Sequence, residues 1–208
     1  MNKKLFITVV QPEDAKDLLS VYAPYVEHTA ISFDYKVPSE EEFKKRISRT
    51  LKDYPYLKAI KGGRIVGYAY AGPFVGRAAY GRCAEVSIYV AEDFRGQGAG
   101  GALYRALEEA LKKFGYLNLE ACVGVPEVPD EYLTRNSLEF HSHMGYRLVG
   151  EFKKCGYKFG RWYDMAWMEK IIGEHSDDPA PVRKFKGEEL YVKDIFWAPG
   201  KRKDILGK

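Results

Sequence analysis

A glycine-rich segment between a predicted strand and a predicted helix constrains the fold of this chain more than any other feature. The segment is FRGQGAGGALYRAL, residues 94–107, and Gly96, Gly98 and Gly101 match the pattern G-x-G-x-x-G. A helix N-terminus presents unpaired N–H groups and a partial positive charge, and glycines let its backbone approach phosphate oxygens closely. The segment therefore predicts a phosphate-binding turn. Several folds use such a turn, so the motif alone does not identify the ligand.

A dinucleotide-binding fold is disfavoured by three observations. Residues 92–95, EDFR, separate the strand from the glycines, whereas the dinucleotide-binding turn follows its strand directly. Glu120, at the distance expected of a ribose-binding carboxylate, lies inside the apolar run LNLEACV and not at its end. Only one βαβ unit is available. A dinucleotide-dependent oxidoreductase therefore stays a remote alternative.

Hydrophobic periodicity predicts the element order β-α-α-β-β-β-α-β-α-β-β. Residues 84–90 alternate, with Glu85 and Ser87 on the polar face of the strand that leads to the glycines. Ser39 with Glu42 predicts a capped helix over residues 39–53. Gly62-Gly63 predicts a hairpin turn.

Composition suits one domain with an extension. The chain has 208 residues, of which 46% are hydrophobic and 30% charged, so a core can form. We assign residues 1–172 to the domain and residues 173–208, where prolines interrupt any periodicity, to an extension packed on the domain or on a partner subunit. No run approaches the roughly 18 apolar residues of a membrane helix, and we expect no signal peptide.

Charge and thiol content narrow the partners. A formal charge of +4 is too balanced for a nucleic-acid-binding protein without a dense basic stripe, so we expect neither nucleic acid nor membrane as a partner. The three cysteines lie far apart and form no C-x-x-C motif, which predicts reduced thiols and a cytoplasmic location. The histidines show no metal-binding spacing, so no metal is expected.

Arg95, Gly98 and Gly100 also give [RQ]-x-x-G-x-[GA], which resembles the pyrophosphate loop of the GNAT N-acetyltransferases. The segments TAISF, YPYLKA, GYAYAGPFVGRAAYGRCAEVSIYV, FHSHMGYRLVGEF and GYKFGRWYDMAWME are similar to the phosphinothricin and methionine sulfoximine acetyltransferase branch. The resemblance covers roughly residues 3–172. It implies an α/β (α+β) fold, with a mixed, mostly antiparallel seven-stranded sheet flanked by helices and a splayed central strand pair.

The same resemblance implies a function. It implies an acetyl-CoA-dependent N-acetyltransferase that acts on the amino group of a small amino acid or analogue, by direct transfer in a ternary complex, as a homodimer. A peptide N-terminus or an aminoglycoside as acceptor, and a non-catalytic acyl-CoA-binding module, stay open as alternatives.

The resemblance also assigns roles to residues. Glu85 is the expected general base, and Val90 the expected main-chain donor to the thioester oxygen. His141 is expected either to protonate the leaving thiolate or to serve packing. The residues expected to contact coenzyme A are Ile88, Tyr89, Val90, Arg95, Gly96, Gln97, Gly98, Ala99, Gly100, Gly101 and Asn136, with Thr134 as the alternative to Asn136. The residues expected to bind the acceptor are Phe33, Arg77, Arg82 and Ser87.

Overall fold

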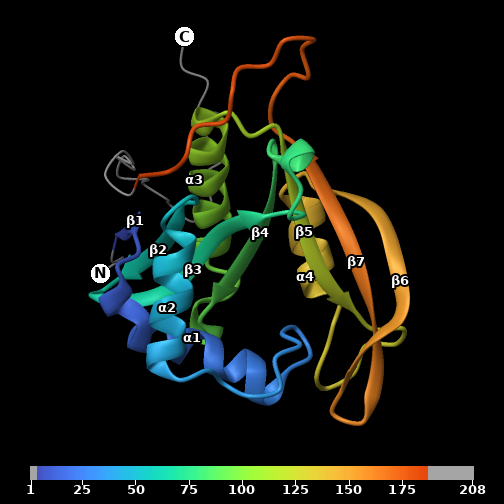
Figure 1. The fold of residues 1–208 in the computed structure, drawn as a ribbon. Coiled ribbons are helices and arrows are strands. Elements are labelled where there is room, and N and C mark those ends of the chain that lie inside the picture. Colours follow the sequence, from blue (N-terminus) through green and yellow to red (C-terminus); the bar gives the residue numbers. More distant parts are fainter. Residues whose placement is uncertain (1–3, 187–208) are drawn as a thin grey trace.

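The computed structural model describes residues 4–186, which form one seven-stranded sheet with helices on both faces (Figure 1). The strands follow the order β1-β2-β3-β4-β5-β7-β6. The strands are β1 (Leu5–Val9), β2 (Tyr56–Lys61), β3 (Arg64–Pro73), β4 (Cys83–Val90), β5 (Asn118–Val125), β6 (Arg147–Lys158) and β7 (Arg161–Ile171). The helices are α1 (Ala15–His28), α2 (Glu40–Thr50), α3 (Ala99–Phe114) and α4 (Asn136–His143).

The centre of the sheet is splayed. Strands β4 and β5 are parallel and pair only over Cys83–Glu85 and Asn118–Glu120, while every other neighbouring pair in the sheet is antiparallel. Beyond this short pairing the two strands diverge, as Figure 1 shows. The predicted fold, a mostly antiparallel seven-stranded sheet, is confirmed, and β4 carries an edge without a strand partner from residue 86 onward.

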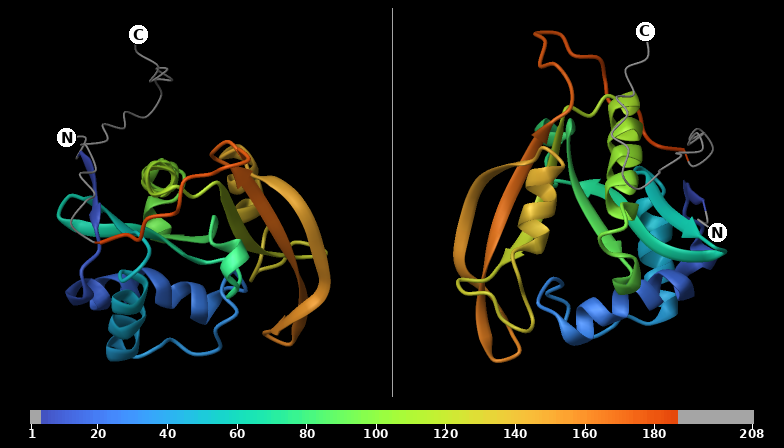
Figure 2. Two further views of the ribbon diagram at one scale, coloured as in Figure 1. Left: turned by 45° about the horizontal axis from the view of Figure 1, so that its top comes forward. Right: turned by 180° about the vertical axis from the view of Figure 1, so that it is seen from behind.

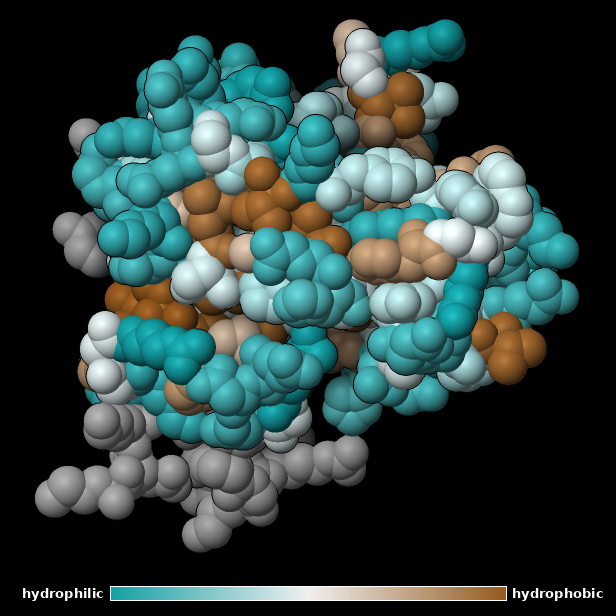
Figure 3. Space-filling model, turned by 90° about the horizontal axis from the view of Figure 1, so that it is seen from below, coloured by the Kyte–Doolittle hydropathy of each residue, from teal (hydrophilic) through white to brown (hydrophobic). Residues whose placement is uncertain are grey.

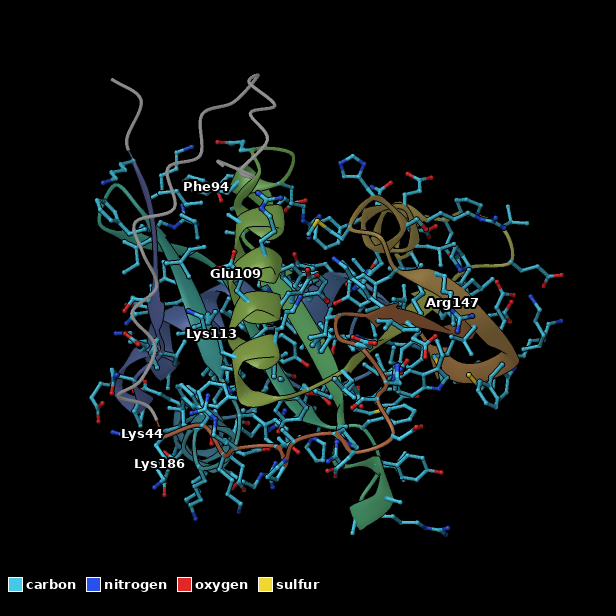
Figure 4. All side chains as sticks on the ribbon, turned by 90° about the horizontal axis from the view of Figure 1, so that it is seen from above. Lys44, Phe94, Glu109, Lys113, Arg147 and Lys186 are labelled. Atoms are coloured by element: carbon cyan, nitrogen blue, oxygen red, sulfur yellow. The ribbon has the colours of Figure 1, made fainter. Side chains whose placement is uncertain are left out.

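Helices α1 and α2 cover one face of the sheet, and α3 covers the other (Figure 2). Helix α3 buries one apolar stripe, and Glu109 and Lys113 point away from the sheet (Figure 4). Its stripe includes Leu103, Leu107, Leu111 and Phe114, all at most 4% exposed. Burying each such side chain contributes about 1.5–3 kcal/mol, so the sheet face holds this helix firmly.

Helix α2 begins as predicted and ends earlier. The Ser39 hydroxyl accepts the Glu42 N–H at 3.1 Å, which caps the helix. The helix ends at Thr50, three residues before the predicted end, and the N–H groups of Lys52 and Asp53 bond to carbonyls three residues back. Pro55 explains this end, because a proline disfavours helical backbone in the residue before it.

The segment after β7 crosses the end of α3. The Arg183 N–H donates to the Phe114 carbonyl at 2.8 Å, and the Phe185 N–H donates to the Asp53 carbonyl at 3.2 Å. The Phe185 ring is 1% exposed and lies edge-on to Phe114. These contacts support the proposal that the extension packs on its own domain; its residues 187–208 lie outside the described part of the chain. Among residues 4–186, no helix combines the length and apolarity needed to cross a bilayer.

Replacing Phe185 by alanine should lower the free energy of unfolding by about 3 kcal/mol, because a buried aromatic side chain is lost from a packed site. Denaturant unfolding measures this change. Lys186→Ala is the matched control, since Lys186 is exposed. An equal, small effect of both substitutions would show that the segment does not pack on α3 in solution.

Candidate functional site

The glycine loop presents the N-terminus of α3 at the open end of the splay. Gly98 is the N-cap residue with φ 83°, and Gly96 has φ 69°. Both values lie in the left-handed region, where any other side chain is strained. No side chain caps this helix, and its first turn contains no acidic residue. The first N–H groups of a 16-residue helix are therefore available to an anion.

Neighbouring groups fix the loop. The Arg95 guanidinium lies 4.8 Å from the centre of the Tyr25 ring, a cation–π contact. The Gln97 side-chain amide donates to the Asp93 carbonyl at 2.7 Å and accepts from Lys61 at 3.0 Å. A Cβ at Gly100 would lie 3.3 Å from the Phe140 ring of α4, so only glycine fits there without displacing that ring. Ala99 is buried as the first residue of α3, and Gly101 lies beside Met144.

The free edge of β4 can be read from one hydrogen bond. The Ala91 N–H donates to the Val66 carbonyl of β3 at 2.9 Å. Because antiparallel pairs alternate, the main-chain groups of Tyr89 also face β3. The main-chain groups of Ile88 and Val90 point toward β5, which diverges from β4 at this level. The main chain of Ile88 is therefore directed into the gap.

The Val90 N–H is already bound, contrary to the sequence-based prediction that it serves as the donor. It donates to the Tyr25 hydroxyl at 3.1 Å, and this hydroxyl donates to the Val90 carbonyl at 2.5 Å. A phenol from α1 thus satisfies both main-chain groups of Val90, which the splay leaves open. No sequence signal indicates this contact.

A small hollow lies between the diverging strands. Its volume is about 50 Å³, and its lining includes Ile31, Ser87, Ile88, Cys122, Gly124 and His141. Figure 3 views the molecule from this open end and shows apolar side chains recessed between hydrophilic ones. The lining combines residues of β4, β5, α3 and α4 with Ile31 of the α1–α2 loop, so the site is built by the tertiary fold.

Glu85 is the last residue of β4 that pairs with β5. It is half-buried, and among the described residues its carboxylate has no hydrogen bond or ion pair. Burial raises the pKa of this carboxyl. Opposite it on β3 lies Gly72, where a Cβ would meet no atom within 4 Å. The carboxylate therefore faces open space on the sheet face that it shares with Ser87 and Tyr70.

His141 lies on α4 at the inner end of the hollow and is 4% exposed. Its Nδ1 bonds to the Ser137 carbonyl at 2.7 Å, so Nδ1 carries the proton. Nε2 then accepts from the Tyr104 hydroxyl at 2.9 Å. Burial lowers the pKa of the imidazole, which favours the neutral form. Tyr104 had been predicted only as part of an amphipathic helix, and periodicity does not distinguish a core phenol from one that reaches a site.

The remaining predicted residues lie in separate places. Asn136 is exposed at the start of α4, and its N–H bonds to the Thr134 hydroxyl at 3.4 Å. Phe33 packs against Gly156 of β6, where a Cβ would lie 2.3 Å from its ring. Arg77 is exposed in the loop after β3.

Arg82 does not face the hollow, and its predicted role in acceptor binding is corrected. Its guanidinium donates to the carbonyls of Pro179 and Ala180 at 2.7 and 3.1 Å. The segment after β7, which the sequence did not place, therefore occupies this side chain.

Glu120, whose distance from the glycines matches that of a ribose-binding carboxylate, is a buried acid in the sheet. It is 6% exposed and lies in register between Glu85 of β4 and Glu169 of β7. Burial, and then the nearby Glu169 carboxylate, raise the pKa of Glu120 to about 7, and Arg147 opposes this in part. Arg147 projects from β6 in Figure 4.

The Acetyltransferase (GNAT) domain family matches residues 7–167. The chain belongs to the GNAT acetyltransferase family. It is 34% identical over 167 residues to phosphinothricin N-acetyltransferase of Alcaligenes faecalis, which covers 80% of this chain and 82% of the relative. It is 26% identical over 164 residues to the L-methionine sulfoximine/L-methionine sulfone acetyltransferase of Salmonella typhimurium, covering 78% and 92%.

A solved GNAT phosphinothricin acetyltransferase from Sinorhizobium meliloti, in complex with AcCoA, superposes with a TM-score of 0.77. It is 29% identical and covers 94% of this chain and 98% of its own. GNAT acetyltransferases use acetyl-CoA. As a member of this family, the protein is an N-acetyltransferase. Within residues 4–186 no three His, Cys, Asp or Glu side chains form a group that suits a metal ion.

Glu120→Gln should raise the free energy of unfolding of this GNAT domain more at pH 8 than at pH 5. The difference between the two effects should be about 2 kcal/mol. The folded protein keeps the Glu120 proton up to about pH 7, whereas an ordinary glutamate loses it near pH 4.5. The stability that protonated Glu120 provides at low pH is therefore lost as the pH rises through about 7. Glutamine does not ionise, so the variant does not lose stability in this way. Denaturant unfolding at both pH values measures it, with the exposed Glu109→Gln as control. An equal effect at the two pH values would contradict the raised pKa.

Proposed function

We propose that this GNAT protein transfers the acetyl group of acetyl-CoA directly to the α-amino group of a small amino acid or analogue of the phosphinothricin type. One observation carries the proposal. The unpaired carboxylate of Glu85, the open edge at Ile88 and the glycine loop at Gly98 follow each other along one segment, at the splay of the sheet. An acid–base group, a strand edge and an anion site are thereby aligned.

The residues present fit coenzyme A. Its diphosphate matches the uncapped N-terminus of α3, where Gly96 and Gly98 let the backbone approach closely. Its amide-containing arm matches the main-chain groups of Ile88, by strand addition at the free edge. When bound, acetyl-CoA supplies an activated thioester. The Ile88 N–H is proposed as the donor to the thioester oxygen, since the Val90 N–H donates to Tyr25, and the Ile88 carbonyl is left for the arm. One such preorganised donor is worth about 3–4 kcal/mol.

Glu85 is proposed as the general base. An α-amine has an ordinary pKa of about 8, so it is mostly protonated at neutral pH and must lose a proton before it attacks. A carboxylate whose pKa is raised by burial is a better proton acceptor than an exposed one. The space left by Gly72 gives the amine, or one bridging water, access to this carboxylate.

Direct transfer is favoured over an acyl-cysteine intermediate. Cys122 lines the hollow and is exposed, but desolvation by the surrounding protein, and then the nearby Glu85 carboxylate, raise the pKa of its thiol to about 11. Such a thiol stays protonated and is a poor nucleophile at neutral pH. His141 Nε2 carries no proton and accepts from the Tyr104 hydroxyl, so this pair is proposed to serve packing at the site. The leaving thiolate is proposed to take up the proton that the attacking nitrogen loses when the amide bond forms.

Acceptor binding is proposed for Arg77, Phe33 and Ser87. Arg77 is exposed in the loop that leads into β4, and its guanidinium suits a carboxylate. The outer strand β6 and its hairpin expose apolar side chains, which supports a homodimer that covers them. These side chains are Leu148, Val149, Phe152, Tyr157 and Trp162. Neither a peptide nor an aminoglycoside acceptor is favoured by a specific contact.

Glu85→Gln should lower kcat/KM for L-phosphinothricin or L-methionine sulfoximine at least about tenfold at neutral pH, because the base is lost. A thiol-release assay measures this change. Binding of CoA, followed by tryptophan fluorescence, should stay unchanged. In the unmodified protein, activity should fall as the pH drops through the raised pKa of Glu85. Full turnover by the variant would remove Glu85 as the base.

Gly98→Asp should weaken CoA binding more than about tenfold beyond the effect of Gly98→Ala. Both substitutions strain the left-handed position, but only aspartate adds a charge that repels the diphosphate. Fluorescence titration of both variants with CoA separates strain from charge. Equal affinities for the two variants would place the diphosphate elsewhere.

A further inference from the structure

A buried lysine fastens the loop that borders the hollow. Lys158, the last residue of β6, is 3% exposed. Its ammonium donates to three main-chain carbonyls, those of Val26 at 2.8 Å, Thr29 at 2.8 Å and Ser32 at 2.7 Å. The three donors of one ammonium are thus matched by three acceptors, and no carboxylate is bonded to it among the described residues.

The position of these carbonyls explains why a charge is tolerated there. Val26 lies in the last turn of α1, and Thr29 is its C-cap. The last carbonyls of a helix lack intrahelical partners and carry its negative dipole end, which favours a cation. Burial lowers the pKa of Lys158, and the Asp34 carboxylate opposes this in part. The ammonium therefore joins the β6–β7 hairpin to the C-terminus of α1 and to the loop that follows.

That loop forms one wall of the site. Ile31 lines the hollow together with Ser87 and His141. Thr29 and Ser32, whose carbonyls Lys158 binds, flank Ile31 in the chain. Phe33 lies against Gly156, two residues before Lys158 on the same strand.

The opposite side of the loop is bound to the helices. The Ser32 hydroxyl is 2.7 Å from that of Tyr22, and the Tyr22 hydroxyl donates to Asp34 at 2.9 Å. Arg46 of α2 donates to the same Asp34 carboxylate at 3.2 Å. These bonds hold Ser32 and Asp34 against α1 and α2. The Ile31 N–H donates to the hydroxyl of Thr29 at 3.2 Å, so Ile31 follows the residue whose carbonyl Lys158 binds, and Phe33 packs on the hairpin at Gly156.

We propose that Lys158 is a positioning residue for the acceptor: by gripping the carbonyls on both sides of Ile31, it holds Ile31 and Phe33 as the wall against which the acceptor binds. This inference rests on the proposed function, since it assigns the loop to the acceptor side of the transfer. Lys158 does not touch the reacting groups. Its loss should therefore affect acceptor binding and leave the chemical step intact.

The test is Lys158→Met, which keeps the length of the side chain and removes the ammonium. With L-methionine sulfoximine or L-phosphinothricin as the probe, the KM of the acceptor should rise at least about tenfold, and kcat should stay within about twofold. The affinity for CoA should not change. Hydrogen exchange of the amides of residues 30–34 should become faster. Lys154→Met is the matched control, because Lys154 is an exposed lysine of the same strand.

A second variant covers the case in which Lys158→Met does not fold. Gly156→Ala places a methyl group where the Phe33 ring now lies, and it leaves the ammonium and its carbonyls in place. It should raise the same KM without changing kcat. Both variants are compared by circular dichroism and thermal unfolding, so that a folded population is assured.

The outcomes are distinct. Faster exchange with an unchanged KM would overturn the inference and leave Lys158 with a structural role alone. A lower kcat with an unchanged KM for the acceptor would also overturn it. If the unmodified protein turns over neither probe, the proposed acceptor class fails. In that case the exchange comparison still decides the inference: unchanged protection of residues 30–34 in Lys158→Met overturns it.

Discussion

The short pairing between β4 and β5 is the constraint on which the rest of the structure depends. Three residue pairs hold the two strands together, and beyond them the sheet opens. The opening exposes the main chain of Ile88 and forms the hollow. Glu85 is the last residue of β4 that still pairs with β5. It also leaves unsatisfied main-chain groups in the interior, which is unfavourable unless other partners reach them. At Val90, the Tyr25 hydroxyl is that partner.

Polar side chains that reach main-chain atoms are the common device. Tyr25 binds both groups of Val90, and Lys158 binds the carbonyls at the end of α1. Arg82 binds the carbonyls of the segment after β7. A side chain that bonds to backbone fixes the path of a segment whatever its sequence, so these contacts shape the loops around the gap. Glu85, the proposed general base, lies among these loops.

Periodicity and the glycine loop predicted the element order, the strand that carries Glu85 and the phosphate-binding turn, because these features depend on local backbone preferences. The same reasoning could not find Tyr25, Tyr104 or Lys158. Each appears in the sequence as an ordinary member of a helix or strand, and its partner lies tens of residues away in the chain. The bond between Tyr25 and the Val90 N–H could not be foreseen for this reason, and the proposal of Ile88 as the donor follows only from the register of β3 and β4.

The last turn of α1 touches both halves of the site. Tyr25 contacts Val90 and Arg95 on the side of the glycine loop, and its neighbour Val26 bonds to Lys158 on the side of the α1–α2 loop. One helical turn therefore borders both of the proposed binding sites. Free energy spent in ordering that turn for one substrate need not be spent again for the other. Donor and acceptor should consequently bind with positive cooperativity, without any large movement of the fold.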